Sequence, residues 1–192
     1  MSFFIRKCRV RVSFYFFPML CVMAFFDRRG FLLRGMLAAL LHEGGHLAAM
    51  VLLPENAPRE VSLTPFGIRI ERSPLSEFGR GNGIILAAGS GMNFLCAAVT
   101  FGFLPAFAAV SLLLGIFNLL PVEGLDGGGI GLLLLSRFMP GGTAGTCVKI
   151  LSWVTLLGIA ALGIYVLIDT GYNFSLLGAA LALAIRYFAD SL

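Results

Sequence analysis

Long apolar runs, most of them the length of a membrane-spanning helix, divide this chain. A helix that crosses the hydrocarbon core of a bilayer needs about 20 mostly apolar residues. The pattern predicts six such segments, separated by turn signals rich in Gly, Pro, Asp and Asn. In chain order they are 10–26, 31–53, 84–104, 106–138 with an interruption near 121–129, 147–168 and 173–188.

The stretch 54–83 follows a different pattern. In "EVSLTPFGIRIERS", apolar and polar residues alternate on both sides of a Pro-Phe-Gly turn, with Val61 and Leu63 before it and Ile68 and Ile70 after it. This alternation favours a β-hairpin, and a polar connecting loop is the alternative. The expected fold is therefore an all-α polytopic membrane protein with about six transmembrane helices. Residues 1–192 form its single domain, and a short hairpin lies between helices two and three.

Composition supports an integral membrane protein. The chain is 58% hydrophobic and 12% charged, with a mean hydropathy of +0.93. Soluble domains are about 45–50% apolar and about 25% charged. The 192 residues leave no room for a sizeable soluble domain beside the membrane part. The four cysteines are widely spaced and form no CxxC pair, so neither a disulfide framework nor a cysteine zinc site is indicated.

The net charge of +4 comes mainly from arginines near segment ends, which indicates membrane topology rather than nucleic-acid binding. The basic N-terminus resembles a signal peptide but lacks a clear small-residue cleavage site, so an uncleaved first helix is expected. A cytoplasmic N-terminus puts most loop charges on the cytoplasmic side, and the discordant pair is Arg28–Arg29. We therefore expect a multi-pass protein of a bacterial cytoplasmic membrane. The cytoplasmic charges are Arg59, Arg69, Arg72, Arg80, Arg137, Lys149 and Arg186.

The second apolar segment contains "ALLHEGGHLAAM", residues 39–50, with both histidines of the chain. His42 and His46 are one helical turn apart on one face, so both imidazoles can bind a single metal ion. Glu43 is placed to take a proton from a metal-bound water, as in HExxH motifs. Zinc is the expected metal, one per chain. The alternative is histidines that only hydrogen-bond between helices, but ionisable side chains inside a bilayer are costly and rare.

A catalytic zinc usually has three protein ligands, so a carboxylate from another helix is expected. The interrupted fourth segment offers Glu123 and Asp126, after Pro121 and beside the run 127–129 of glycines. Broken helices occur at membrane depth where they line a cavity or face protein. The residues alone leave both acids open. Asp126 has a short side chain that loses little freedom on ligation and lies next to flexible backbone, whereas Glu123 could reach solvent or hold a basic substrate residue.

Together these motifs resemble the site-2 protease family of intramembrane zinc metalloproteases, most closely its sporulation-factor-processing branch without a PDZ insertion. The resemblance covers about 31–138 and implies zinc ligands His42, His46 and Asp126, Glu43 as catalytic base, and a substrate-binding role for Asn93 and Asn118. The bottom-up alternative for the asparagines is satisfaction of backbone groups near a helix break. No nucleotide-sensing CBS domain is expected. The matching segments are His42-Glu43-Gly44-Gly45-His46, Asn118-x-x-Pro121, Leu125-Asp126-Gly127-Gly128 and, without the family's usual proline, Gly89-Ser90-Gly91-Met92-Asn93.

The expected function is zinc-dependent hydrolysis of a peptide bond in a membrane-associated or membrane-spanning substrate segment, reached from the cytoplasmic side. The expected partners are that protein substrate, the lipid bilayer and regulatory membrane proteins, with no nucleic acid. Two other functions remain open. One is a catalytically inactive pseudoprotease, against which the intact Glu43 argues. The other is a metal-binding transporter-like protein, against which the lack of an inverted repeat argues.

Overall fold

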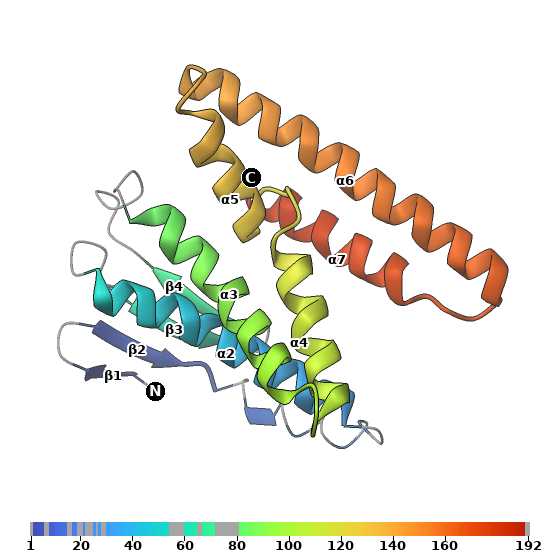
Figure 1. The fold of residues 1–192 in the computed structure, drawn as a ribbon, viewed down its shortest axis with the longest axis horizontal. Coiled ribbons are helices and arrows are strands. Elements are labelled where there is room, and N and C mark those ends of the chain that lie inside the picture. Colours follow the sequence, from blue (N-terminus) through green and yellow to red (C-terminus); the bar gives the residue numbers. More distant parts are fainter. Residues whose placement is uncertain are drawn as a thin grey trace. The chain divides into compact units, whose positions relative to one another are not determined.

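A computed structural model gives the fold (Figure 1). It divides into two compact units, Met1–Phe117 and Asn118–Leu192, which are described separately. The structure describes residues 2–5, 8–14, 17, 18, 21, 25, 27, 30–53, 60–64, 67–71 and 81–190.

The first unit contains a four-stranded sheet in the order β1-β2-β3-β4. β1 (Ser2–Ile5) and β2 (Cys8–Val12) pair antiparallel, and β2 pairs parallel with β3 (Glu60–Thr64). Parallel neighbours need a long crossover, and helix α2 lies in this one. β4 (Gly67–Glu71) pairs antiparallel with β3, so that Val61 lies opposite Ile70 and Leu63 opposite Ile68.

The sheet corrects two sequence expectations. The fold is not all-α with an isolated hairpin, because β3 and β4 belong to a sheet that also includes the N-terminal strands. The first predicted helix cannot begin at Val10, because β2 occupies Cys8–Val12. The physical reason lies in Arg9-Val10-Arg11-Val12, where polar and apolar residues alternate with the period of a strand. Most of the remaining stretch to Phe26 lies outside the described residues.

Helix α2 (Phe31–Leu52) has a defined start. The Asp27 carboxylate accepts hydrogen bonds from the backbone N–H groups of Phe31 (2.9 Å) and Leu33 (3.1 Å), which satisfies two donors that the first turn leaves without helical partners. Gly30 precedes the helix with φ 65°, a left-handed conformation that favours glycine.

α2 packs along α3 (Asn82–Thr100) in the first unit. Ala49 and Met50 of α2 form an apolar core with Ile85 of α3. The two helices approach closely at Gly45, where an added Cβ would lie 2.5 Å from the carbonyl oxygen of Ala88. Small residues permit this kind of close helix contact in membranes.

α4 (Pro105–Asn118) follows α3 after a short turn that begins at Thr100. It approaches α3 at Gly115, where an added Cβ would lie 2.7 Å from the Phe94 ring and 3.3 Å from the Asn93 Cβ. The close approach places α4 beside the stretch of α3 that carries Asn93.

The second unit is helical. α5 (Asp126–Leu135) is followed by the long α6 (Gly141–Thr170) and by α7 (Ser175–Asp190), which lies along α6. α6 ends at Thr170 and is followed by Gly171, whose φ of 76° is the left-handed conformation common just after a helix. Trp153 of α6 and Tyr187 of α7 form an edge-to-face aromatic pair, with ring centroids 5.6 Å apart.

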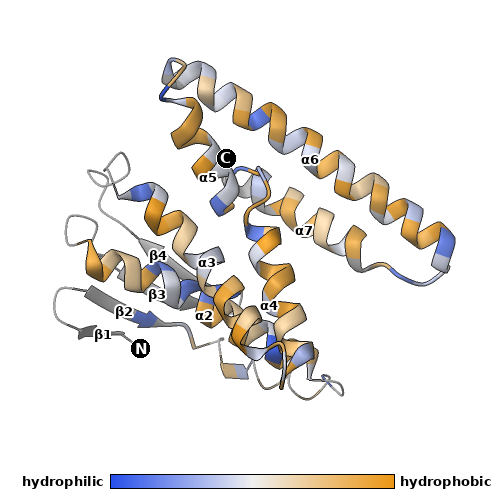
Figure 2. Cartoon of the chain, in the orientation of Figure 1, coloured by the Kyte–Doolittle hydropathy of each residue, from blue (hydrophilic) through white to orange (hydrophobic). Residues whose placement is uncertain are grey.

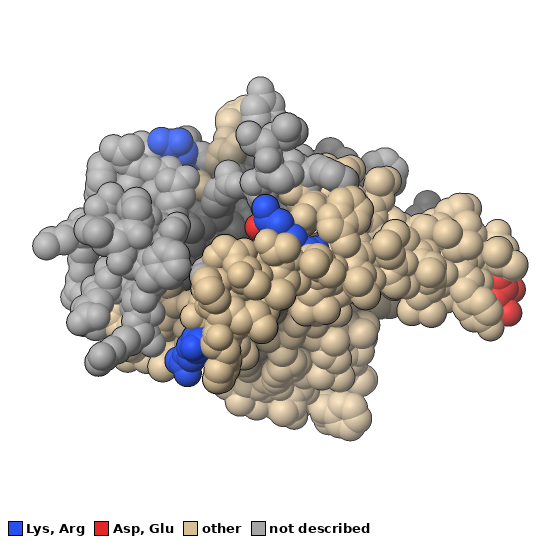
Figure 3. Space-filling view, turned by 90° about the horizontal axis from the view of Figure 1, so that it is seen from above, with Lys and Arg blue, Asp and Glu red and all other residues tan. Residues whose placement is uncertain are grey.

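Three of the described helices are long and apolar enough to cross a membrane: Phe31–Leu52, Asn82–Thr100 and Gly142–Thr170. Much of their ribbon is orange, the colour of hydrophobic residues, in Figure 2, and most of the described surface in Figure 3 is neither acidic nor basic. The chain is therefore a membrane protein. Among the described residues, three helices rather than the predicted six are long enough to span a membrane, since α4, α5 and α7 are shorter apolar helices. The fourth predicted segment is divided by the irregular stretch 119–125 into α4 and α5, which shortens both.

Candidate metal centre

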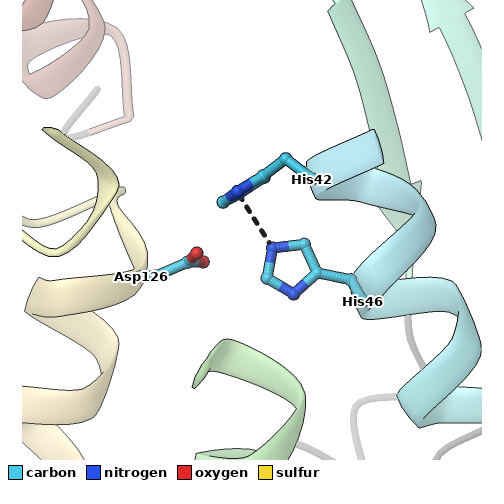
Figure 4. Close-up of side chains that lie close together, drawn as sticks. All are labelled: His42, His46 and Asp126. Carbon is cyan, nitrogen blue, oxygen red and sulfur yellow. Dashed lines mark hydrogen bonds between the residues drawn. The ribbon is translucent and has the colours of Figure 1, made fainter. Parts of the chain in front are cut away.

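The two histidines of α2 lie on successive turns and face the same side (Figure 4). Their Nε2 atoms are 3.1 Å apart, and the rings meet edge to face with centroids 4.7 Å apart. His42 is 5% exposed and His46 6% exposed, although both belong to an otherwise apolar helix. The i, i+4 spacing of the sequence thus becomes a pair of adjacent ring nitrogens.

Helix α3 holds both rings from their Nδ1 side. The Nδ1–H of His46 donates to the backbone carbonyl of Ile85 across 2.6 Å. The side-chain amide of Asn93 donates to Nδ1 of His42 across 3.2 Å. A hydrogen bond donated by one ring nitrogen, as at His46, fixes the orientation of an imidazole whose other nitrogen can bind a metal. The Asn93 amide orients the His42 ring from the same helix.

Gly89 of α3 lies directly against the two rings. A Cβ added there would be 2.8 Å from Cε1 of His42 and would also collide with the His46 ring. The absence of a side chain at this position lets α3 approach the histidine pair.

Glu43 follows His42 in α2 and is half-buried. Its place next to the first histidine keeps it in the same turn as the candidate ligands. A carboxylate at this position of an HExxH helix can act as a proton acceptor without being a ligand.

In the second unit, Asp126 is the first residue of α5 and is half-buried. A carboxylate in the first turn of a helix interacts favourably with the positive end of the helix dipole. The preceding stretch, 119–125, turns through Gly124, whose φ of 89° is readily adopted by glycine. Its backbone is closed by hydrogen bonds from Leu125 N–H to the Val122 carbonyl (3.0 Å) and from Gly129 N–H to the Leu125 carbonyl (3.1 Å).

Two glycines let α5 begin close to this turn. A Cβ on Gly127 would collide with the Leu119 carbonyl group, and one on Gly128 with the Val122 carbonyl group. The glycine run 127–129 therefore has a packing role as well as a flexible backbone.

Ser152 of α6 links the turn to its own helix. Its hydroxyl accepts a hydrogen bond from the backbone N–H of Glu123 (2.8 Å) and donates to the carbonyl of Val148 (2.8 Å). Ser152 is 0% exposed, so this hydrogen bond is buried. A buried N–H donor without an acceptor would destabilise the fold.

The remaining candidates differ in position. Asn93 lies within α3, and its side-chain amide contacts the His42 ring. Asn118 is the last residue of α4, at the break, and is half-buried. Glu123 has an exposed side chain, while Asp126 is half-buried. Two contacting residues carry no sequence signal. Ile85 acts through its backbone carbonyl, and Ser152 is an ordinary small residue in an apolar helix.

The donor atoms suit zinc. Two nitrogen ligands at 2.0–2.1 Å from a tetrahedral zinc ion are separated by roughly 3.3 Å, close to the 3.1 Å between the two Nε2 atoms. Imidazole nitrogen and carboxylate oxygen are both common zinc donors. The histidine pair therefore fits two positions of a zinc site.

These features define a membrane protein with a buried HExxH histidine pair in a helix beside a small sheet. No protein-family model matches the sequence. No curated protein matches it either. Among solved structures, the fold is similar to that of the Site-2 Protease from Methanocaldococcus jannaschii, with a TM-score of 0.66 and 20% sequence identity over 98% of this chain and 92% of that one. This likeness establishes the fold.

Proposed function

We propose that the protein is an intramembrane zinc metalloprotease. The observation that carries this proposal is the buried pair of imidazoles on a membrane helix, with Nε2 atoms 3.1 Å apart and a carboxylate at the adjacent position. The fold, which resembles a site-2 protease, supports the same reaction class.

The proposed ligands are His42, His46 and Asp126, the side chains drawn in Figure 4. Each offers one ligand atom, a ring nitrogen or a carboxylate oxygen. Two histidines and one carboxylate are a known catalytic zinc set, which keeps a position for water or substrate. Asp126 is preferred to Glu123 because the turn before α5 and the glycines after Asp126 fix its backbone, whereas Glu123 is exposed.

When bound, zinc polarises the scissile carbonyl and makes water a stronger nucleophile. Glu43 takes a proton from the attacking water and passes it to the leaving amine. Asn118, at the end of α4, is proposed to hydrogen-bond the substrate backbone, and Asn93 is proposed to bind the substrate as well. The buried surroundings strengthen these polar interactions because the local dielectric constant is low.

The proposed substrate is a membrane-associated or membrane-spanning segment that unwinds locally, since an intact helix keeps its carbonyls in hydrogen bonds. The proposed orientation places the N-terminus and the access to the site on the cytoplasmic side, which the distribution of arginines supports. Cysteine introduced at Ser73 should then react with a membrane-impermeant reagent only after the cells are opened. Labelling from outside intact cells would contradict this orientation.

The decisive experiment separates base from ligand. Purified protein in detergent is assayed for zinc content and for cleavage of a model membrane substrate, beside Glu43→Gln and His46→Phe. Glu43→Gln should keep about one zinc per chain and lose cleavage, because glutamine cannot accept the water proton. His46→Phe should lose both, since it removes a ligand.

The same assays test the other functions. Near wild-type cleavage by Glu43→Gln would show that the hydrolytic mechanism is wrong. Zinc binding without cleavage by the wild-type protein would favour a pseudoprotease. Zinc that crosses the membrane in reconstituted vesicles, without cleavage, would favour a transporter.

A further inference from the structure

Hydrogen bonds on the histidine pair define where each imidazole carries its proton. The Nδ2 atom of Asn93 is an amide NH2 group, which only donates, so Nδ1 of His42 must accept. A neutral His42 then carries its proton on Nε2, facing Nε2 of His46. His46 is the opposite tautomer, because its Nδ1 faces the Ile85 carbonyl and must donate.

This order is self-consistent. The Asn93 amide donates to His42, the Nε2–H of His42 donates to Nε2 of His46, and the Nδ1–H of His46 donates to the Ile85 carbonyl. Each bond has one donor and one acceptor, with both imidazoles neutral. In this order Nε2 of His42 carries a proton and offers no lone pair to a metal ion.

Metal binding requires a different proton position on His42. Each Nε2 must present a lone pair to the ion, so a neutral ligand has its proton on Nδ1. His46 already meets this condition through Ile85. His42 does not, and its proton must move from Nε2 to Nδ1. The group that faces Nδ1 of His42 must then be an acceptor.

Asn93 holds that acceptor in the same side chain. Its Oδ1 atom is buried and has no hydrogen-bond partner among the described residues, and the side chain is 0% exposed. A half-turn of the amide exchanges Oδ1 and Nδ2, which have nearly the same shape. The turn brings the acceptor to Nδ1 of His42 without moving either helix.

We propose that Asn93 is a positioning residue that sets the tautomer of His42, with its amide donating in the metal-free protein and turned to accept when zinc is bound. This inference deepens the proposed function and rests on the proposal that the histidine pair binds zinc. It gives Asn93 a second role beside the substrate contact proposed above.

Because the chain has two histidines, ¹⁵N-histidine labelling reports on these two rings alone. In zinc-free protein in detergent, NMR should find one Nδ1–H ring and one Nε2–H ring. After zinc is added, both rings should be Nδ1–H. Two Nδ1–H rings in the zinc-free protein would overturn the proposal.

Zinc affinity, measured by competition with a chromophoric chelator, gives a second readout. Asn93→Asp always presents an acceptor oxygen, so its affinity should equal or exceed that of the wild type. Asn93→Leu removes the acceptor and should bind zinc roughly 10–100-fold more weakly, the range for lost partners of metal-binding histidines. Ser111→Ala, which changes a buried serine of α4, is the control and should leave the affinity unchanged.

The outcomes separate this inference from the function on which it rests. Zinc binding as tight in Asn93→Leu as in the wild type, or equally weakened in Asn93→Asp and Asn93→Leu, would refute the positioning role and leave the metalloprotease proposal standing. Failure of the wild-type protein to bind zinc would refute the proposed function. If Asn93→Leu fails to fold, Asn93→Asp and the zinc-free spectrum still decide the question.

Discussion

The histidine pair and the turn before Asp126 hold proposed ligands of one metal by different means. His42 and His46 are fixed by the regular spacing of an unbroken helix, and α3 needs only to orient rings that already share a face. Asp126 follows an irregular stretch whose backbone is held by glycine contacts and by Ser152, a residue 26 positions further along the chain. The first arrangement is local in sequence, and the second depends on distant contacts.

The difference predicts how each region responds to substitution. A helix in a membrane keeps all of its backbone hydrogen bonds internal, so a changed side chain on α2 should leave the helix intact. The turn at 119–125 has no regular series of helical hydrogen bonds. A substitution at a residue that holds the turn can therefore shift Asp126 without changing Asp126 itself. Substitutions at the ligands themselves should have the largest effects, and substitutions at their supports smaller ones.

Loss of a ligand is the largest expected effect. Asp126→Ala and His42→Ala should each reduce zinc from about one per chain toward none, because a catalytic zinc usually needs three protein ligands. Zinc content of the purified proteins, measured by atomic absorption, checks this. Glu123→Gln is the matched control for Asp126, since it changes a nearby exposed acid, and it should keep its zinc.

Full zinc in Asp126→Ala together with depleted zinc in Glu123→Gln would exchange the two assignments. Full zinc in both would show that the third ligand lies elsewhere, and the proposed pairing of the α2 histidines with the start of α5 would be wrong.

Crowding of the histidine rings is expected to have an intermediate effect. In Gly89→Ala the new Cβ would collide with both imidazoles, so either the rings or α3 must shift. We expect zinc affinity to fall by about 10- to 100-fold, similar to the loss of a ligand's hydrogen-bond partner. The measurement is chelator competition, with protein melting temperature recorded beside it.

Gly91→Ala is the control for this substitution. It lies on the same helix, and among the described atoms an added Cβ there would meet nothing within 4 Å. It should leave zinc affinity unchanged and stabilise the helix slightly, since alanine is the better helix former by about 1 kcal/mol in water. Equal losses of zinc affinity in both variants would mean that the substitutions act by changing α3 itself and not by crowding the histidine rings.

The sequence predicts the contacts that are local along the chain better than those between distant segments. His42 and His46 were placed on one helical face from their spacing alone, because a helix fixes the neighbours of every residue at i and i+4. The break between α4 and α5 was also predicted, since Pro121 and the following glycines disfavour a continuous helix. The contacts of Ile85, Gly89 and Ser152 could not be predicted, because they join segments whose mutual position emerges only from packing.

The N-terminal error has a different cause. The apolar residues after Val10 and Val12 favour a membrane helix, whereas the alternation of these valines with arginines is typical of a strand. Their partner strand β3 lies about 50 residues later, and no local signal in the sequence indicates a parallel pairing over that distance.

The smallest expected effect tests the support of Asp126. Ser152→Ala removes the acceptor for the Glu123 N–H, and a buried hydrogen bond contributes about 1 kcal/mol, so a several-fold loss of zinc affinity is expected. Thr155→Ala removes a hydroxyl that bonds only to its own helix, at the Leu151 carbonyl, among the contacts described, and should leave affinity unchanged. Ser152→Thr keeps a hydroxyl and should restore most of the affinity. If Ser152→Ala lowers the melting temperature as expected but binds zinc as tightly as Thr155→Ala, the turn holds Asp126 without α6, and both proposed ligand regions are locally determined after all.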